Sequence, residues 1–428
     1  MEAIVASGQD SQIPELDVTN PFSNQASYVI DRTQTQNTCP TPVLSPTGVR
    51  TAKVHISDGN FLDLSTLVFT FDVVNLDGAN ALRPANAIPS CWFRRMIIKM
   101  SGCVIEDISN LDRIEAQIQS FVSTNKRRNW GDAGSGWDTL TDWGTDALPS
   151  QIATRGKVCW RPLSSGFLTC GKYLPMMGGS SGLQIELELA DLTAACVNHT
   201  SKSATWQLEH FNVNCDSVTL TSEFTENFSS LLINGDSILI PFQSNSMDVQ
   251  YLSAGGGDHT ISLAKQFSRL ATVIVSLCDN APAEASADSS VGVYEKEANR
   301  FYLGATSSET VESYLSLNNK RYPQFNTIGC RHHFMRLMQG LGILNSVSHS
   351  TNISKLGYGD ETAVVSRQFC IMHDTELVPN SDASGISVQG GGIIQCTIKN
   401  TGAPTKAYIT SHFDACLEIR AQGAILYS

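Results

Sequence analysis

The chain has 428 residues, a formal net charge of −12 and only 16% charged residues, so it neutralises few phosphates. A main role in sequence-specific or salt-dependent nucleic-acid binding is therefore excluded. The length allows two ordinary domains or one large one, and the low charge predicts much neutral polar surface or extensive burial in subunit contacts.

Residues 1–47 are rich in Ser, Thr, Asn, Gln and Pro and show no hydrophobic periodicity. We expect an extended arm that is either disordered or ordered along a neighbouring subunit, and the apolar pair Val29–Ile30 favours the second. Arg32 is the only basic residue among residues 1–49, so the arm is not of the arginine-rich type that condenses a genome. No secretory hydrophobic region follows Met1, and no apolar run approaches the roughly 18 residues of a membrane span.

The 12 cysteines are scattered singly, without a C-x-x-C pair. This spacing fits neither a disulfide framework nor a zinc site, so free buried thiols in a reducing compartment fit best. We expect a protein that folds in the cytosol or nucleus.

Alternation of apolar and polar residues begins after the arm and recurs along the chain, most clearly over 53–56, 67–74, 183–189 and 415–422. A period of two is typical of half-buried strands, and Gly, Asn, Asp and Pro separate the runs. Many strands with few helices indicate sandwiches or barrels.

Only three stretches show helical spacing. The first covers 109–122, with Ser109 and Asp112 as a candidate capping box. The second covers 222–235 and ends in Asn-Gly, which predicts a left-handed C-cap. The third covers 334–342 and ends in Gly340 and Gly342.

Two short matches on either side of the middle helix indicate one fold used twice. Phe-Arg-Arg-Met at 93–96 resembles Phe-Ser-Arg-Leu at 267–270, and each precedes an apolar strand. Trp-x-x-x-His-Phe-Asn at 206–212 resembles Tyr-x-x-x-His-Phe-Asp at 408–414. Each repeat would suit an eight-stranded jelly roll with long loops.

The predicted organisation has four parts: an arm over 1–47, a first jelly roll over 48–221, a connecting helix over 222–235 and a second jelly roll over 236–428. A long loop over 126–155 holds Trp130, Trp137 and Trp143 and is expected to make contacts between subunits or over a core. A second, more polar loop is expected over 279–300.

A search for catalytic motifs finds none in a suitable context. The sequence Gly-Gly-Ser-Ser-Gly at 178–182 matches a nucleophile elbow, but a strand pattern follows where that motif needs a helix, so a Gly/Ser turn is the better interpretation. His332 and His333 are adjacent and face about 100° apart on a helix, which favours one packed and one solvated histidine over a metal site. His210 and His412 occupy matched repeat positions, which favours a shared packing role.

The remaining motifs also have structural interpretations. His259 follows an aspartate but belongs to no H-x-x-x-H or H-E-x-x-H motif. The glycine triplets at 255–257 and 390–392 lack any phosphate-binding pattern and predict turns or bulges. The basic triplet at 126–128 is interpreted as a solvated helix end rather than a nucleic-acid or subunit contact. We therefore predict no catalytic, cofactor-binding or metal-binding residues, no cofactor and no enzymatic activity.

Several segments, taken in order, resemble one family. They are Ser-Pro-Thr-Gly-Val at 45–49, Asp-Leu-Ser-Thr-Leu at 63–67, the motif at 93–96 leading into 102–108, the connection at 206–239, the motif at 267–270, Arg-Tyr-Pro at 321–323 and Leu-Glu-Ile at 417–419. In their number and order they resemble the double jelly-roll major capsid proteins of small and mid-sized DNA viruses, in particular polinton-like viruses and virophages.

The resemblance implies an all-β fold of two tandem eight-stranded antiparallel jelly rolls with a few short helices. It also implies a virion protein that forms homotrimers with pseudo-sixfold outline, contacts neighbouring capsomers and penton and minor capsid proteins, and tiles an icosahedral shell. The alternatives are a single-layer capsid protein of an RNA or single-stranded DNA virus, a carbohydrate-binding β-sandwich and a hydrolase on a β scaffold. The missing basic arm counts against the first, the free cysteines against the second and the absence of any constellation against the third.

Overall fold

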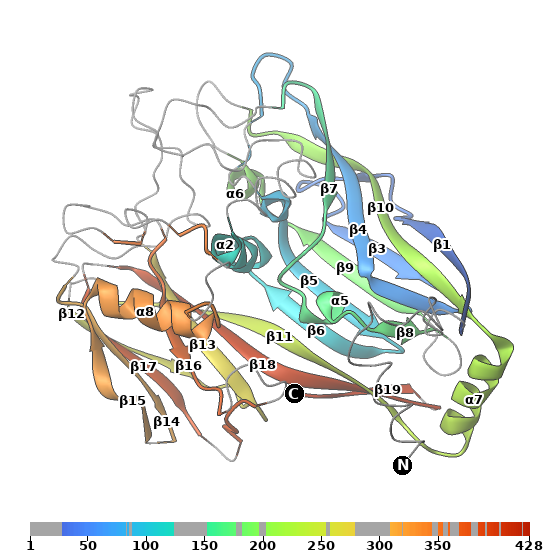
Figure 1. Ribbon diagram of the computed structural model, residues 1–428. Coiled ribbons are helices and arrows are strands. Elements are labelled where there is room, and N and C mark those ends of the chain that lie inside the picture. Colours follow the sequence, from blue (N-terminus) through green and yellow to red (C-terminus); the bar gives the residue numbers. More distant parts are fainter. Residues whose placement is uncertain are drawn as a thin grey trace, which may run out of the picture.

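A computed structural model describes residues 28–82, 84, 88–123, 152–176, 182–196, 203–253, 257–278, 309–318, 320–344, 350–353, 358–359, 368–377, 384–389, 392–401, 404–421 and 423–428. Within these ranges, four antiparallel sheets form two jelly rolls that lie side by side (Figure 1). Most of the predicted loop at 126–155, the loop at 279–300 and the triplet at 126–128 lie outside the described residues.

The first roll consists of a six-stranded and a four-stranded sheet. The strands of the larger sheet are β1 (Val29–Thr38), β2 (Val43–Leu44), β4 (Phe61–Asn75), β7 (Arg155–Trp160), β8 (Tyr173–Pro175) and β10 (Trp206–Leu220). Their order is β1-β10-β4-β7, with β2 beside β10 and β8 beside β4. The smaller sheet contains β3 (Thr51–Ile56), β5 (Phe93–Met100), β6 (Cys103–Ser109) and β9 (Leu183–Leu189), in the order β3-β9-β5-β6.

The second roll repeats this arrangement. Its larger sheet contains β11 (Ile238–Tyr251), β13 (Leu270–Cys278), β16 (Ile371–Asp374), β18 (Lys406–Arg420) and β19 (Gly423–Tyr427). Their order is β11-β18-β13-β16, with β19 beside β18. The smaller sheet contains β12 (Gly257–Leu263), β14 (Glu312–Leu317), β15 (Lys320–Ile328) and β17 (Ile394–Thr401), in the order β12-β17-β14-β15.

The same wiring occurs in both rolls. If β2, β8 and β19 are set aside, each roll has eight strands in the described residues, and the first, eighth, third and sixth strands form one sheet. The second, seventh, fourth and fifth strands form the other. A helix of 11 residues follows the fifth strand in each roll: α2 (Leu111–Phe121) and α8 (Cys330–Gly340). The predicted fold class of two tandem antiparallel jelly rolls is confirmed.

Alternating sequence becomes alternating burial where the sequence predicted strands. In β3 every second residue, Ala52, Val54 and Ile56, is buried, while Lys53 and His55 are exposed. The runs at 67–74 and 183–189 lie in β4 and β9, as expected, and the run at 415–422 lies in β18 as far as Arg420. Burial of the apolar faces stabilises each roll by about 1.5–3 kcal/mol per large aliphatic or aromatic side chain.

Aromatic rings fill the centre of the first roll. Phe93 stacks on Trp160 at a centroid distance of 5.5 Å and meets Phe71 edge to face at 5.4 Å. Phe71 stacks on Phe211 of the same sheet at 5.7 Å, whereas the contacts of Phe93 on β5 join the two sheets across the roll. The second roll instead centres on β13, whose nine residues are all buried between β18 and β16.

The predicted helices are present, with one correction. The middle helix, α7 (Ser222–Ile233), ends as expected: Gly235 has φ 91°, and the amides of Gly235 and Asp236 donate to the carbonyls of Leu232 and Leu231. The capping box predicted for α2 is wrong. Asn110 is the N-cap residue, in a left-handed conformation and without a side-chain cap.

Three short helices complete the described secondary structure: η3 (Pro89–Trp92), α5 (Gly166–Thr169) and α6 (Leu192–Ala195). None of the described helices has the length and apolarity needed to cross a membrane.

The prediction of an arm over 1–47 is wrong for its C-terminal part. β1 pairs antiparallel with β10 in the first roll, and Arg32 forms ion pairs with Asp63 (2.6 Å) and Asp216 (2.7 Å). The strand escaped prediction because seven of its ten residues are exposed, so hydrophobicity does not alternate along it. Residues 1–27 lie outside the described residues.

Only one of the two sequence matches marks equivalent elements. The match between 206–212 and 408–414 falls on β10 and β18, the eighth strands of the two rolls. The match between 93–96 and 267–270 pairs the fourth strand, β5, with the approach to the third strand, β13, so it does not reflect the repeat.

Candidate assembly site: the seam between the rolls

The motifs singled out as candidate chemistry lie in strands, turns and helices of the two rolls where the structure describes them. β9 begins at Leu183, directly after the Gly/Ser segment, so a strand stands where a nucleophile elbow needs a helix. No cluster of three metal-ligating side chains occurs in the described ranges. Residues 178–181 themselves lie outside these ranges.

His332 and His333 divide as predicted into a packed and a partly solvated residue. The His333 ring is buried; its Nδ1 donates to the Gly329 carbonyl at 2.7 Å and its Nε2 accepts from the Ser313 hydroxyl at 2.8 Å. Burial lowers the pKa of His333 to about 4, which keeps the ring neutral. The half-buried His332 stacks on Phe325.

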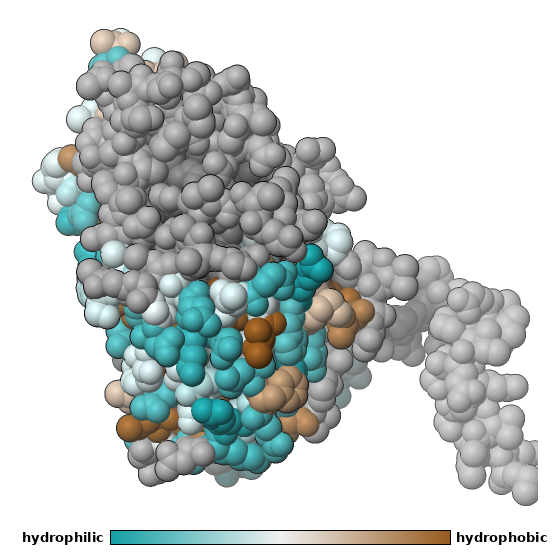
Figure 2. Space-filling model, turned by 90° about the vertical axis from the view of Figure 1, so that its left-hand side faces the viewer, coloured by the Kyte–Doolittle hydropathy of each residue, from teal (hydrophilic) through white to brown (hydrophobic). Residues whose placement is uncertain are grey.

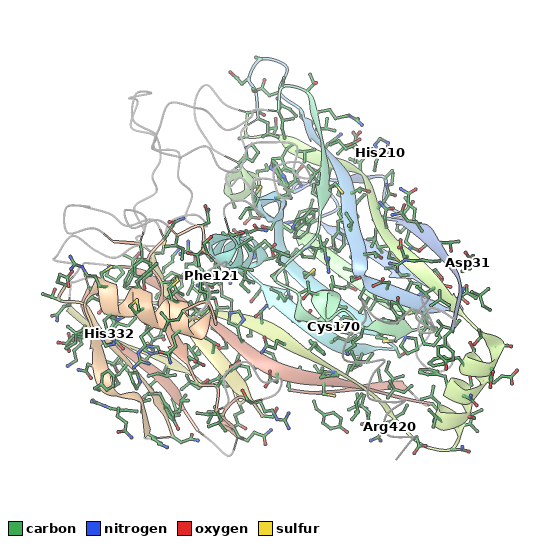
Figure 3. All side chains as sticks on the ribbon, in the orientation of Figure 1. Asp31, Phe121, Cys170, His210, His332 and Arg420 are labelled. Atoms are coloured by element: carbon green, nitrogen blue, oxygen red, sulfur yellow. The ribbon has the colours of Figure 1, made fainter. Side chains whose placement is uncertain are left out.

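The expectation of a shared packing role for His210 and His412 is wrong. His210 is exposed on the outside of the first roll, has φ 52° and lies 3.0 Å from Asp72 (Figure 3). Burial instead lowers the pKa of His412 to about 4. The two strands differ here because the register of β10 against β4 shifts between Glu209 and Asn212, which turns His210 outward.

The remaining candidates also lie in the framework. His259 is buried on β12, and desolvation lowers its pKa. Gly257 opens β12 beside a register shift against β17, which agrees with the predicted bulge. Gly392 lies just before β17, where a Cβ atom would come within 1.8 Å of the Asn318 side chain.

The two rolls meet along a contact that we call the inter-roll seam. The first roll contributes β6, α2 and the segment 163–167, and the second contributes β11, β18 and β19. In Figure 1, α2 lies between the two rolls. Part of the seam is apolar: Phe167 meets Phe242 edge to face at 5.4 Å, and Met247 packs with the core of the first roll.

Glu106 on β6 is the most unusual group in the seam. Its side chain is buried, and its carboxylate accepts hydrogen bonds from the hydroxyls of Ser165 and of Ser244 (2.8 Å), one from each roll. Burial raises its pKa to about 7, and the hydrogen bonds offset only part of this effect. The carboxyl group therefore links the rolls most favourably when it is protonated.

A second buried carboxylate supports the same contact from α2. Glu115 accepts hydrogen bonds from the amides of Leu163 and Ser164, both at 2.9 Å, and burial raises its pKa. In the same segment, the Ser164 carbonyl accepts a 2.5 Å hydrogen bond from the Asn245 side chain of the second roll. This connection reaches from α2 to the second roll through hydrogen bonds alone.

The side of α2 that carries Arg113 and Gln117 contacts β18 directly. The Thr410 hydroxyl donates to the Gln117 side chain at 2.7 Å, and the Arg113 guanidinium lies 4.7 Å from the centre of the Tyr408 ring. Both α2 residues are buried despite their polarity. Buried polar groups need fixed partners, so these contacts specify one relative position of the rolls.

Close approach at Gly166 makes this position still more specific. A Cβ atom built on Gly166 would lie 1.3 Å from the Gln243 carbonyl oxygen of β11. Glycine is thus required because two backbones touch across the seam. Neither this glycine nor Glu106 carries a sequence signal, since their partners are 77 and 138 residues away in the chain.

No protein-family profile and no curated protein matches the sequence. Solved structures do match the fold. The crystal structure of PBCV-1 VP54, fitted into a reconstruction of the virophage Sputnik, has a TM-score of 0.65 and 12% identity over 94% of this chain and 97% of the other. The cryo-EM structure of the Sputnik virophage has a TM-score of 0.57 and 12% identity over 96% of this chain and 91% of the other. The Faustovirus major capsid protein has a TM-score of 0.59 and 7% identity over 90% of each chain.

These similarities span nearly the whole of both chains, so the two rolls match together and not one at a time. The fold is that of the double jelly-roll capsid proteins, as the resemblance in the sequence implied.

Proposed function

We propose that this chain is a viral major capsid protein. Three copies would form a trimer with pseudo-sixfold outline, since each contributes two rolls of one topology, and such trimers would tile an icosahedral shell. The observation that carries the proposal is the double jelly-roll fold, shared over nine tenths or more of both chains with structures that include the Faustovirus major capsid protein. The partners would be neighbouring capsomers and penton and minor capsid proteins, and the location would be the virion.

The seam supports a role in assembly. It fixes the two rolls as one unit through buried polar contacts, as a building block with defined angles requires. The proposed division of the chain places one roll before α7 and one after it, with α7 as the connection. The described residues of the candidate motifs make packing contacts, hydrogen bonds or turns within the two rolls, which supports a protein without catalytic activity.

The native mass of the purified protein tests this proposal. Light scattering should give a species near three times 46.4 kDa, and negative-stain images of the same sample should show hexagonal outlines or closed shells. A monomer that stays dispersed at high concentration would refute the proposal. In that case glycan binding would become the first activity to examine.

A further inference from the structure

The two rolls share one unit, the fifth strand and the helix that follows it, and its residues correspond one to one. β6 ends at Ser109 and β15 ends at Ile328, 219 positions later. One residue with positive φ follows in each case, Asn110 (51°) or Gly329 (79°), and an 11-residue helix begins at once. An offset of 219 therefore aligns the two units without a gap.

The inward sides of the two units agree under this offset. Three buried residues of the first unit have buried counterparts in the second, in the pairs Ile108 with Thr327, Leu111 with Cys330, and Ile114 with His333. The agreement explains why a histidine is buried at this place: His333 occupies the position that an isoleucine fills in the first roll.

The residues that form the seam differ sharply in burial from their counterparts in the second unit. In the first unit Glu106, Arg113 and Gln117 are buried because they form the inter-roll seam. Their counterparts in the second unit are Phe325, which is exposed, and His332 and Arg336, which are half-buried. Phe325 is 57% exposed.

Two further positions of the unit follow the same rule. Ile328 is the counterpart of Ser109, which donates to the Met247 carbonyl across the seam, and it is 51% exposed. Met335 is the counterpart of Ala116 and is also 51% exposed, whereas Ala116 is buried. The side of the unit that is buried inside the chain in the first roll is thus open in the second.

These open residues form an ordered cluster, which we call the α8–β15 face: Phe325, Ile328, His332, Met335 and Arg336. The Phe325 and His332 rings stack at 6.0 Å with an interplanar angle of 17°, and the Arg336 guanidinium lies 5.4 Å from the Phe325 ring centre. Figure 3 shows His332 at the end of the second roll away from the first. Figure 2 views this end, where apolar side chains lie among polar ones.

We propose that the α8–β15 face binds the first roll of a second copy of this chain, on the outer side of its β1–β10 pair. The proposal rests on the proposed trimer and names the surfaces that would form it. Inside the chain, the equivalent part of β6 and α2 is covered by β11 and β18, the first and eighth strands of the second roll, and by β19 beside β18. The first and eighth strands of the first roll are β1 and β10.

Continuity with the seam identifies a second copy as the occupant. If each roll presents its fifth strand and helix to the first and eighth strands of the next roll, contacts within and between chains alternate. Such head-to-tail contacts close into a ring when the rotation permits, as in a trimer with pseudo-sixfold outline.

The two surfaces also complement each other in chemistry. The α8–β15 unit carries four cations, at Lys320, Arg321, Arg331 and Arg336. The β1–β10 pair carries the exposed acidic Asp31, whereas Glu209 and Asp216 already form ion pairs with Arg155 and Arg32. β1 and β2 also expose the apolar Ile30 and Val43. An aromatic–arginine anchor facing exposed aliphatic groups with a polar rim is typical of a specific protein interface.

Single substitutions on the exposed cluster test the proposal without disturbing the core. Phe325→Asp and Met335→Asp are each expected to weaken trimer formation by roughly 30-fold or more, as measured by analytical ultracentrifugation over a concentration series. Ile233→Asp on α7 is the matched control, because Ile233 is an exposed aliphatic residue outside the face, and it should leave the trimer intact. All variants should keep the wild-type circular dichroism and unfolding temperature.

A photo-crosslinking amino acid at position 325 provides the second measurement. In a mixture of isotopically light and heavy chains, crosslinks between copies should map to residues of β1, β2 or β10. Trimers that persist in both Asp variants, or crosslinks that map elsewhere, overturn this inference while the capsid proposal stands. A wild-type protein that never forms a trimer overturns both.

Discussion

The substitution Glu106→Gln tests the polar seam directly, because glutamine keeps the shape of the side chain but cannot ionise. In the folded protein burial raises the pKa of Glu106 from 4.5 to about 7. The protonated carboxyl is thus favoured in the folded state, and the stability it contributes is fully present below pH 4.5 and is lost as the pH rises to 7. At about 1.4 kcal/mol per pKa unit, the loss is about 3 kcal/mol.

The expected result is a pH-dependent difference between the two proteins. At pH 5 the free energies of unfolding should differ little, since the glutamine amide can keep hydrogen bonds to Ser165 and Ser244. At pH 8.5 the variant should be more stable than the wild type by about 3 kcal/mol. Urea unfolding of the assembled protein at pH 5, 7 and 8.5 measures this difference, and the contribution of Glu115 cancels because both proteins contain it.

Glu418→Gln is the matched control. Hydrogen bonds from Arg420, Ser237 and Tyr427 lower the pKa of Glu418 to about 2, so its contribution to stability is present above pH 4.5 and is lost as the pH falls toward 2. The difference between this variant and the wild type should therefore be flat from pH 5 to 8.5. If the Glu106→Gln difference is equally flat, Glu106 is ionised in the folded seam and the reasoning fails.

Three further predictions concern the framework. Gly166→Ala should prevent the rolls from docking and lower the unfolding temperature sharply in a thermal melt, whereas Gly59→Ala, with open space around its Cβ, should change little. Lowering the pH from 6.5 to 4 should destabilise the protein because burial lowers the pKa of His333 to about 4, and His333→Asn should reduce this dependence in the same melts. In a labelling time course with iodoacetamide followed by mass spectrometry, the exposed Cys159 should react first. Three buried thiols whose pKa is raised to about 12 should react only on unfolding: Cys330, Cys370 and Cys396. Early labelling of these three in the folded protein would contradict the described burial.

Hydrophobic periodicity predicted the strands that have one buried face, such as β3 and β9, and the helices α7 and α8 with their glycine stops. It missed β1 because that strand lies at the edge of its sheet and is held by backbone pairing to β10 and by the ion pairs of Arg32. Neither source of stability leaves a periodic pattern in the sequence.

The repeat shows the same limit more clearly. The match between 93–96 and 267–270 is similar in sequence but joins non-equivalent strands. The repeat at β6–α2 and β15–α8 has no identical residue among its buried positions, since Ile108, Leu111 and Ile114 correspond to Thr327, Cys330 and His333. What it conserves is a backbone path through one residue with positive φ, which Asn and Gly can both adopt. Sequence comparison at the level of residue types cannot detect it.

The polarity of the seam has a physical reason within this repeat. An apolar seam between two rolls would tolerate sliding, because the hydrophobic effect is non-directional. Glu106 and Gln117 instead place buried polar groups whose hydrogen bonds to Ser244 and Thr410 form in only one relative position of the rolls. The outward face of the second roll carries Phe325 and Met335 at the corresponding place, as suits a contact that must first form between separate chains. The contact inside the chain would then be specified by polar groups and the proposed contact between copies by apolar anchors, although both occupy the same position in the fold.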